Sequence, residues 1–136
     1  MSFNTTIIDQ WATAWSSHDV DRVLRLFTDN CTYEDVPIGV VNRGKDALRV
    51  FAEFFFSVAP DFKIEVARRF EIEGWAAGEW TMFGTQKGDM PNLPATGKLF
   101  SIRGVTILEL EGEKISRCSD YWDMAAFLKQ LGHQLG

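Results

Sequence analysis

The sequence of 136 residues contains few cysteines and histidines, and these shortages exclude several kinds of site. Its two cysteines, Cys31 and Cys118, lie far apart without a CxxC spacing. We therefore expect two buried thiols, not a disulfide or a metal-binding pair. The two histidines, His18 and His133, are also far apart, so no His/Cys metal site is expected.

Positive charge and long apolar runs are scarce as well. Fourteen Lys and Arg residues against nineteen Asp and Glu residues give a net charge of −5, and the basic residues form no cluster beyond Arg68-Arg69. A nucleic acid is therefore not an expected partner. No stretch approaches the roughly 18 apolar residues of a membrane span, and the N-terminus lacks the pattern of a signal peptide. We expect a cytoplasmic protein that binds no membrane.

Aromatic residues, in contrast, are abundant. Five Trp, eleven Phe and two Tyr make up 13% of a chain that is 46% hydrophobic and 24% charged. A chain of this size and composition is expected to fold as a single domain over residues 1–136. Buried aromatic rings supply large apolar walls, and their N–H and O–H groups need polar partners. The composition therefore indicates a packed core or a ligand cavity.

Hydrophobic periodicity predicts mainly helices in the first half of the chain and mainly strands in the second half. The first helix has a capping box formed by Thr6 and Asp9, and Asp19 and Asp123 are the expected caps of two others. The expected helices cover residues 5–16, 20–30, 44–58 and 124–131. The expected strands cover residues 31–36, 62–72, 75–85, 99–110 and 114–122.

Helices followed by antiparallel strands define an α+β domain, in which the helices cover one face of a curved sheet. If the sheet bends around the Phe-rich helix 44–58, a cavity lined by aromatic rings opens between them. The connection over residues 86–97 contains two glycines and two prolines, and it is either a lid over the cavity or a plain hairpin connection.

Several short motifs follow one another in a recognisable order along nearly the whole chain. They occupy residues 14–15 with 19–21, then 33–37, 43–47, 80–85, 95–98, and finally 120–123 with 130–132. Their order and spacing resemble the nuclear transport factor two-like superfamily, and within it the SnoaL-like polyketide cyclase group with its limonene-epoxide-hydrolase relatives. The resemblance implies a cone-shaped, cystatin-like fold, with N-terminal helices on a strongly curved, mixed, mostly antiparallel sheet around a pocket. It also implies a homodimer and chemistry without a cofactor.

The resemblance also assigns candidate catalytic residues. In the cyclases, one aspartate near the end of the last strand is acid and base in an intramolecular aldol closure, and it matches Asp120. The Tyr-x-Asn of the epoxide hydrolases matches Tyr33 and Asp35, and their Arg-x-Asp matches Trp80 and Met82. Because this second match lacks the acid, the sequence favours a cyclase, or a related isomerase or dehydratase, over a hydrolase.

The spacing of the candidate residues indicates that their side chains project from one face of the sheet. Tyr33 and Asp35 are two apart in an expected strand, so both side chains project to one side. In the last strand, Asp120 is expected to share its face with Cys118 and Ser116. An aspartate walled by aromatic rings loses hydration, which raises its pKa and suits it to proton transfer near neutral pH. We expect Asp120 to move the proton and Tyr33 and Asp35 to bind substrate oxygens.

Each assignment has a structural alternative. Asp35 could instead shape the turn into Pro37, and Asp120 could be an edge-strand carboxylate bonded to a neighbouring backbone group. Asp123 is interpreted as a helix cap without chemistry.

The expected pocket takes a small apolar molecule, and the domain is either an enzyme or a non-catalytic module that binds such a ligand. The candidates for the pocket wall are Trp15, Phe51, Phe55, Trp80, Met82 and Cys118.

Overall fold

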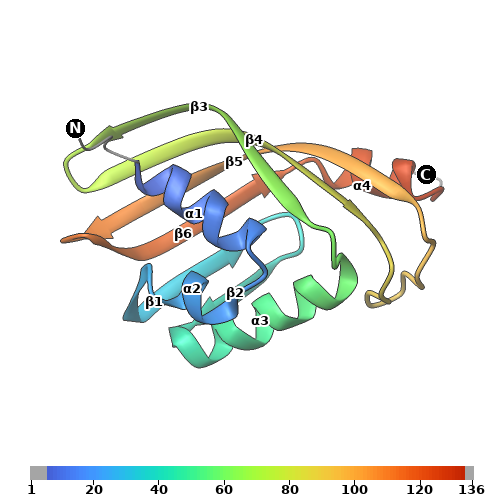
Figure 1. Ribbon diagram of the computed structural model, residues 1–136, viewed down its shortest axis with the longest axis horizontal. Helices are drawn as coiled ribbons and strands as arrows, with labels where there is room; N and C mark the ends of the chain where they lie inside the picture. The colour runs from blue at the N-terminus through green and yellow to red at the C-terminus, as the bar shows by residue number, and fades with distance from the viewer. Residues whose placement is uncertain (1–5, 134–136) are drawn as a thin grey trace.

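The computed structural model describes residues 6–133, which form four helices and one six-stranded sheet (Figure 1). The helices are α1 (Ile7–Ser16), α2 (Val20–Leu24), α3 (Gly44–Val58) and α4 (Met124–Gln130). The strands are β1 (Phe27–Asp35), β2 (Val40–Arg43), β3 (Lys63–Ile72), β4 (Trp75–Thr85), β5 (Leu99–Glu111) and β6 (Lys114–Trp122). Among residues 6–133, no helix is both long enough and apolar enough to cross a membrane.

The strands form a mixed, curved sheet in the order β2-β1-β6-β5-β4-β3. Every neighbouring pair is antiparallel except β1 and β6, which are parallel. Helices α1, α2 and α3 lie on the same side of the sheet (Figure 1). The predicted α+β class, with helices packed on a curved and mostly antiparallel sheet, is therefore confirmed.

Helix α1 begins as the capping box predicts. The Thr6 hydroxyl accepts a hydrogen bond from the Asp9 backbone N–H at 3.1 Å and donates one to the Asp9 carboxylate at 2.7 Å. The buried face of α1 lies on the sheet, where Ile8 packs against Gly78 of β4 so closely that a Cβ on Gly78 would collide with it. This close approach brings the tryptophans of α1 next to the inner face of the sheet.

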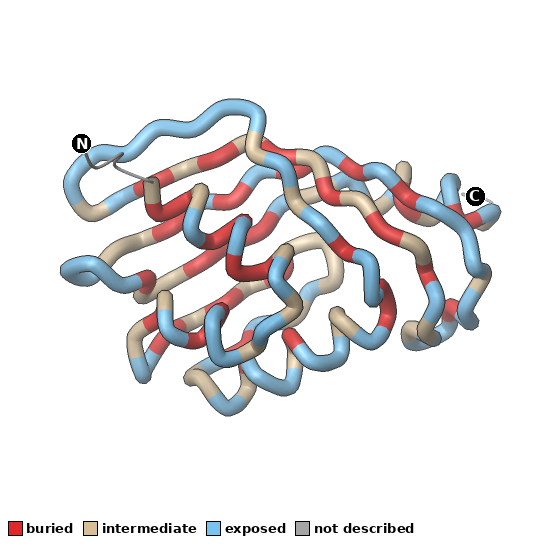
Figure 2. Tube along the Cα trace, viewed as in Figure 1, coloured by how far each residue is buried: buried red, intermediate tan, exposed pale blue. Residues whose placement is uncertain are grey.

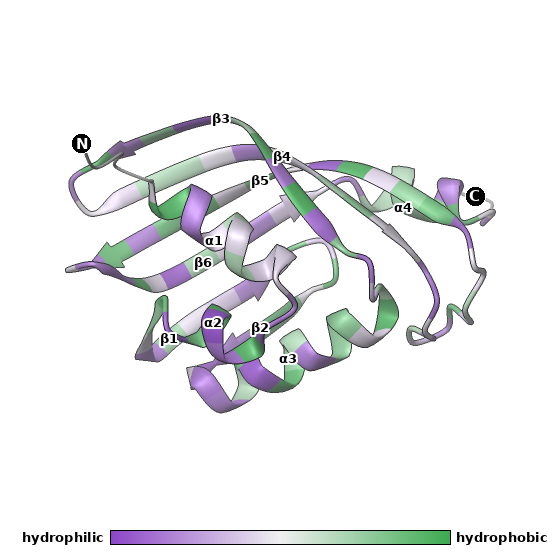
Figure 3. Ribbon diagram, in the orientation of Figure 1, coloured by the Kyte–Doolittle hydropathy of each residue, from purple (hydrophilic) through white to green (hydrophobic). Residues whose placement is uncertain are grey.

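Helix α3 carries both hydrophobic and hydrophilic residues (Figure 3). Its apolar side faces the sheet. Leu48 and Ala52 are fully buried, and Phe51 and Phe55 are half-buried. Phe54, in contrast, is 38% exposed. The half-buried phenylalanines are therefore available to line a cavity.

The start of the sheet differs from the prediction. The second helix ends at Leu24, not near residue 30, and β1 begins at Phe27. Phe27 is fully buried and pairs with Ile115 of β6, so a contact distant in sequence overrides the local helical period. The short strand β2 was not predicted; it pairs with β1 after a turn in which Gly39 has a φ of +79°.

The second half of the chain agrees closely with the prediction. Buried residues alternate with partly buried ones along β4 and mostly with exposed ones along β5, as the sequence pattern requires (Figure 2). The turns after β3 and β5 place Gly74 and Gly112 at positive φ, +82° and +63°. The carboxylate of Asp123 caps α4 by accepting a hydrogen bond from the Ala126 N–H at 2.9 Å.

The connection between β4 and β5 is organised around one buried amide. Gln86 is fully buried; its Nε2 donates to the Leu93 carbonyl at 2.9 Å, and its Oε1 accepts from the hydroxyl and the N–H of Thr96. No residue of 86–98 lines the pocket described below. This arrangement supports a hairpin connection and gives no support to a lid.

Candidate active site

Parallel pairing of β1 and β6 brings the candidate catalytic residues together. Tyr33 lies opposite Cys118 and Asp35 lies opposite Asp120, on neighbouring strands. Because side chains alternate along a strand, Tyr33, Asp35 and Asp120 all project to the inner face. All three are buried, and all three line one pocket.

The expected face of β6 needs one correction. The register between β5 and β6 shifts at Ser116, so that Ile115 faces Leu110 and Arg117 faces Glu109, with Ser116 as the extra residue. A bulge of this kind reverses which side chains point inward. Ile115 is therefore buried inside, whereas the Ser116 hydroxyl donates to the Glu109 carbonyl at 3.1 Å and does not share a face with Asp120.

Protein hydroxyl groups hold both oxygens of the Asp120 carboxyl group. The Tyr33 hydroxyl donates to Oδ2 at 2.5 Å, and the Thr106 hydroxyl donates to Oδ1 at 2.6 Å. The Cys118 thiol makes a weaker contact with Oδ1 at 3.5 Å. Behind Thr106, the indole N–H of Trp80 donates to the threonine oxygen at 2.8 Å. The carboxyl group is thus fixed in position and cannot rotate freely.

The environment raises the pKa of Asp120 to about 7. Burial is the largest cause because it removes water from the charged form, and the negative charge of Asp35 adds to it. The hydroxyls of Thr106 and Tyr33 oppose the rise by stabilising the carboxylate. Burial and the nearby Asp120 also raise the pKa of Tyr33 well above its usual value, so Tyr33 stays a hydrogen-bond donor. Asp120 can therefore gain or lose a proton near neutral pH.

Asp35 occupies a second polar position in the pocket. Its carboxylate accepts hydrogen bonds from the indole N–H of Trp122, at 3.0 Å and 3.2 Å to its two oxygens, and from the Ile38 N–H at 3.2 Å. Burial raises the pKa of Asp35 to about 6, although both donors lower it. Asp35 therefore shapes the turn after β1, through Ile38, and also faces the pocket.

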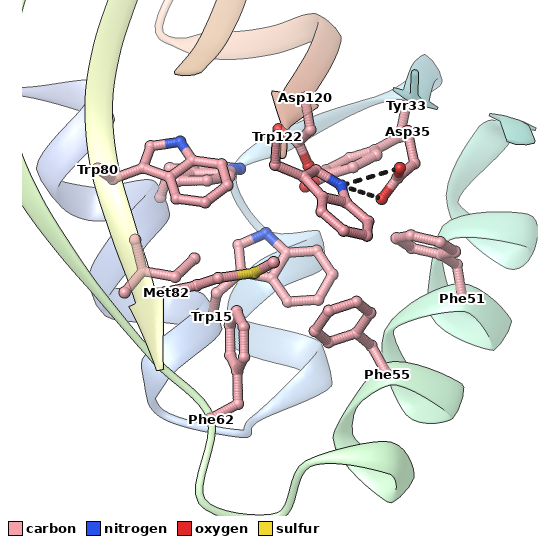
Figure 4. Close-up of a pocket in the computed structure, with 12 residues that line it drawn as sticks. Trp15, Tyr33, Asp35, Phe51, Phe55, Phe62, Trp80, Met82, Asp120 and Trp122 are labelled. Carbon is pink, nitrogen blue, oxygen red and sulfur yellow. Dashed lines mark hydrogen bonds between the residues drawn. The ribbon is translucent and has the colours of Figure 1, made fainter. Parts of the chain in front are cut away.

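The pocket lies between α1, α3 and the inner face of the sheet (Figure 4). The space between its atoms is about 340 Å³, a volume that also counts open solvent at its mouth. Five residues predicted for the wall line it, namely Trp15, Phe51, Phe55, Trp80 and Met82. Cys118 does not line the pocket; it is fully buried beside Asp120. Four further residues in the wall were not predicted, namely Trp11, Phe62, Ile64 and Trp122.

Strand alternation could have identified Trp122 in the wall and also Thr106, which lies behind the wall and was not predicted either. Trp122 is two residues beyond Asp120 in β6, so it projects to the same face. Thr106 interrupts an inward series of apolar residues in β5, where a polar side chain needs a buried partner. That partner is Asp120.

The pocket contains acids and aromatic rings but no cation. Among the described residues, no lysine, arginine or histidine lines it. Within residues 6–133, no cluster of three or more His, Cys, Asp or Glu side chains could hold a metal ion. Glu79 and Arg103 lie on the opposite face of the sheet, where Arg103 and Arg68 both bond to Glu79. The arrangement is suited to proton transfer on a neutral molecule.

Comparison with known proteins agrees with this architecture. The family model described as SnoaL-like polyketide cyclase matches residues 5–131, and no curated protein matches the chain. A protein of ketosteroid isomerase-like fold from Catenulispora acidiphila has a TM-score of 0.85 at 21% identity, with 97% of this chain and 96% of that chain covered.

Two further solved structures have similar scores. A proposed SnoaL-like polyketide cyclase from Jannaschia sp. has a TM-score of 0.84 at 14% identity, with 95% of this chain and 91% of that chain covered. IdmH, a proposed polyketide cyclase from Streptomyces antibioticus, has a TM-score of 0.79 at 18% identity, with 93% and 96% covered. At these identities the similarity shows the fold, and it confirms the nuclear-transport-factor-two-like architecture that we expected.

Proposed function

Because the chain belongs to the SnoaL-like polyketide cyclase family, we propose that it is a cofactor-independent acid/base enzyme acting on a small, apolar, enolisable carbonyl compound. One observation carries the proposal: the Asp120 carboxyl group is buried in an aromatic pocket, fixed by two hydroxyls, with a pKa of about 7. Such a group is half ionised near neutral pH, which suits it to remove and return a proton.

The favoured reaction is an intramolecular aldol closure. The Asp120 carboxylate removes a proton from the carbon next to a carbonyl group, which gives an enolate. The enolate carbon attacks a second carbonyl of the same molecule, so that a carbon–carbon bond forms and an alkoxide results. Asp120 then returns its proton to the alkoxide, and the net reaction consumes no other reagent. The aromatic wall holds the two ends of the substrate together, which supplies the entropic part of ring closure.

Tyr33 and Asp35 have different roles in this proposal. The Tyr33 O–H already donates to Asp120, so Tyr33 positions the carboxyl group instead of binding a substrate oxygen. The Asp35 carboxylate accepts hydrogen bonds from the Trp122 indole and the Ile38 N–H, and Asp35 lies opposite Asp120 on the neighbouring strand. Its negative charge raises the proton affinity of Asp120, which makes the Asp120 carboxylate a stronger base for removing the substrate proton.

The alternative functions have less support from the pocket. A non-catalytic module would not need two buried acids with raised pKa values in one pocket. The isomerase and dehydratase readings use the same proton transfer from Asp120. The hydrolase reading needs an acid where Trp80 and Met82 stand, and both of these line the pocket.

The test is deuterium exchange at carbon, which does not require the natural substrate. The protein is incubated in heavy water with β-tetralone, anthrone or ethyl benzoylacetate, and loss of the acidic C–H signal is followed by proton NMR. We expect the protein to accelerate exchange of at least one ketone, and Asp120→Asn to slow it by about a hundredfold or more. Asp123→Asn is the matched control, because it makes the same change three residues away at a helix cap.

The proposal fails if Asp120→Asn exchanges as fast as the Asp123→Asn control. It also fails if none of the three ketones exchanges faster than in buffer. Thermal unfolding of both variants shows whether any loss of rate is a loss of fold.

A further inference from the structure

Four tryptophans line the pocket, and their indole N–H groups fall into two pairs. Trp80 donates to the Thr106 hydroxyl and Trp122 donates to Asp35, so both of these groups are satisfied by the protein. The nitrogens of Trp11 and Trp15 are buried and have no hydrogen-bond partner among residues 6–133. Two buried indole N–H groups in the pocket wall therefore lack a hydrogen-bonded oxygen or nitrogen partner among residues 6–133.

Trp15 is held rigidly by the rings around it. Its indole makes edge contacts with Tyr33, Phe51, Phe55 and Phe56 at centroid distances between 5.5 Å and 6.4 Å. The side chain is only 3% exposed. In Figure 4 its nitrogen is turned toward the side of the pocket where Trp80 and Asp120 lie. The orientation of the Trp15 N–H group is therefore fixed by the surrounding rings.

The two unpartnered nitrogens are not equivalent. The Trp11 indole lies near enough to the Cys118 sulfur to lower the pKa of that thiol, so its N–H faces a weak acceptor. The Trp15 nitrogen has no hydrogen-bond partner among residues 6–133. A buried donor without an acceptor costs about 1–3 kcal/mol, and a ligand oxygen recovers that energy on binding. Trp15 is therefore the donor with most to gain from a ligand.

The charge of the pocket defines the ligand oxygen. Two acids face the pocket, and the described lining has no cation, so a carboxylate or phosphate on the substrate would be repelled. A neutral carbonyl oxygen suits an indole N–H, and the developing charge of an enolate oxygen suits it better because water is excluded. A hydrocarbon of the same shape would leave the N–H unpaired.

We propose that the indole N–H of Trp15 binds the carbonyl oxygen of a neutral aromatic ketone and stabilises the enolate that forms there. This inference rests on the proposed function, since the enolate is the one that Asp120 creates. It names the substrate class as an uncharged, flat carbonyl compound. Trp15 becomes a specificity-determining residue that distinguishes a ketone from its hydrocarbon.

The experiment compares two probes of nearly equal shape, α-tetralone and tetralin, whose binding is measured by quenching of tryptophan fluorescence. The wild-type protein binds the ketone more tightly than the hydrocarbon. Trp15→Phe keeps an aromatic ring but removes the N–H, so its affinity for α-tetralone falls about tenfold while its affinity for tetralin stays the same. Trp11→Phe is the matched control, and it keeps the preference for the ketone.

A second measurement uses the unaltered protein and does not depend on the folding of a variant. In nitrogen–proton NMR spectra, the indole N–H resonance of Trp15 moves downfield when α-tetralone is added and does not when tetralin is added. The inference is overturned if wild type does not prefer the ketone, if the Trp15 resonance does not move, or if Trp11→Phe alone loses the preference.

The result of the binding experiment on Trp15 is independent of proton transfer by Asp120. Binding of α-tetralone by wild type and by Trp15→Phe is measured without turnover, so it does not depend on Asp120 acting as a base. If Trp15→Phe binds both probes normally while Asp120→Asn has lost exchange, this inference fails and the proposed function stands.

Discussion

Thr106 tunes the acid that carries the proposed chemistry. Its hydroxyl lies between two side chains, donating to Asp120 at 2.6 Å and accepting from the Trp80 indole at 2.8 Å. Of the groups that lower the pKa of Asp120, Thr106 has the largest effect. Thr106 touches no part of the pocket space itself, so it acts through Asp120 as a positioning residue.

Replacing Thr106 with valine tests this role at the scale of one residue. The hydroxyl stabilises the charged carboxylate, so its loss raises the pKa of Asp120 above its value of about 7. We expect a rise of about one pH unit, measured by carbon NMR titration of the Asp120 carboxyl group. The proposed base must be deprotonated, so the rising limb of the exchange rate moves to higher pH by the same amount.

Thr106→Ser is the matched control because it restores the hydroxyl without the methyl group. It brings the titration and the rate profile back toward wild type. A purely structural role for Thr106 would lower stability in the valine variant and leave the pKa of Asp120 unchanged.

At the scale of elements, the contact between β4 and β5 positions the indole behind Thr106. Gly104 lies opposite Trp80 in the register of these strands, and the Trp80 ring lies across it. A Cβ on Gly104 would stand inside the van der Waals distance of three ring atoms of Trp80. The missing side chain therefore allows Trp80 to reach Thr106.

Gly104→Ala is expected to displace Trp80 and to lower the free energy of unfolding by about 1–3 kcal/mol, the usual cost of overpacking. Urea unfolding measures this loss. Ser101→Ala, at an exposed position on the same strand, is the control and leaves the stability nearly unchanged. A Gly104→Ala protein as stable as wild type would show that the ring moves aside at no cost.

Local sequence patterns predict the bounds and caps of several elements but not the long-range pairing of strands. The sequence pattern predicts the bounds of β4 and β6 to the residue, and side-chain chemistry predicts the caps at Thr6 and Asp123. The parallel pairing of β1 with β6 joins residues 85 apart, such as Asp35 and Asp120, and no local period contains that information.

The same limit applies to the candidate site. The resemblance brought Tyr33, Asp35 and Asp120 together, but their hydrogen-bond partners depend on register. The bulge at Ser116 moved that residue off the inner face, because one extra residue changes the alternation. The Tyr33 hydroxyl bonds to Asp120 because β1 pairs with β6, and sequence alone does not reveal this long-range pairing.

At the scale of the whole molecule, helices α1–α3 lie on one side of the sheet and leave its outer face without a covering helix from this group (Figure 1). The register places several exposed residues side by side on this outer face, namely Phe70, Ile72, Trp75, Val105, Ile107 and Tyr121. Among them, Glu79 bonds to Arg68 and Arg103, so both signs of charge are present. Exposed apolar area of this kind is typical of an interaction surface.

We propose that this outer face binds a second copy of the chain, as the expected homodimer requires. A face that carries apolar residues together with both signs of charge can pack against itself about a two-fold axis. Ile107 lies near the centre of the face, where a charge would be desolvated on association. Ile107→Glu is therefore expected to convert the protein from a dimer, with about twice the 15.4 kDa of one chain, to a monomer.

Light scattering after gel filtration measures the mass directly. Val50→Glu is the matched control, because Val50 is a 69% exposed apolar residue on α3, away from the outer face. It leaves the dimer intact, and both variants keep the pocket and hence the exchange activity, since Ile107 does not line it. A wild-type mass of one chain at tens of micromolar, or equal dissociation by both substitutions, would contradict this assignment of the outer face.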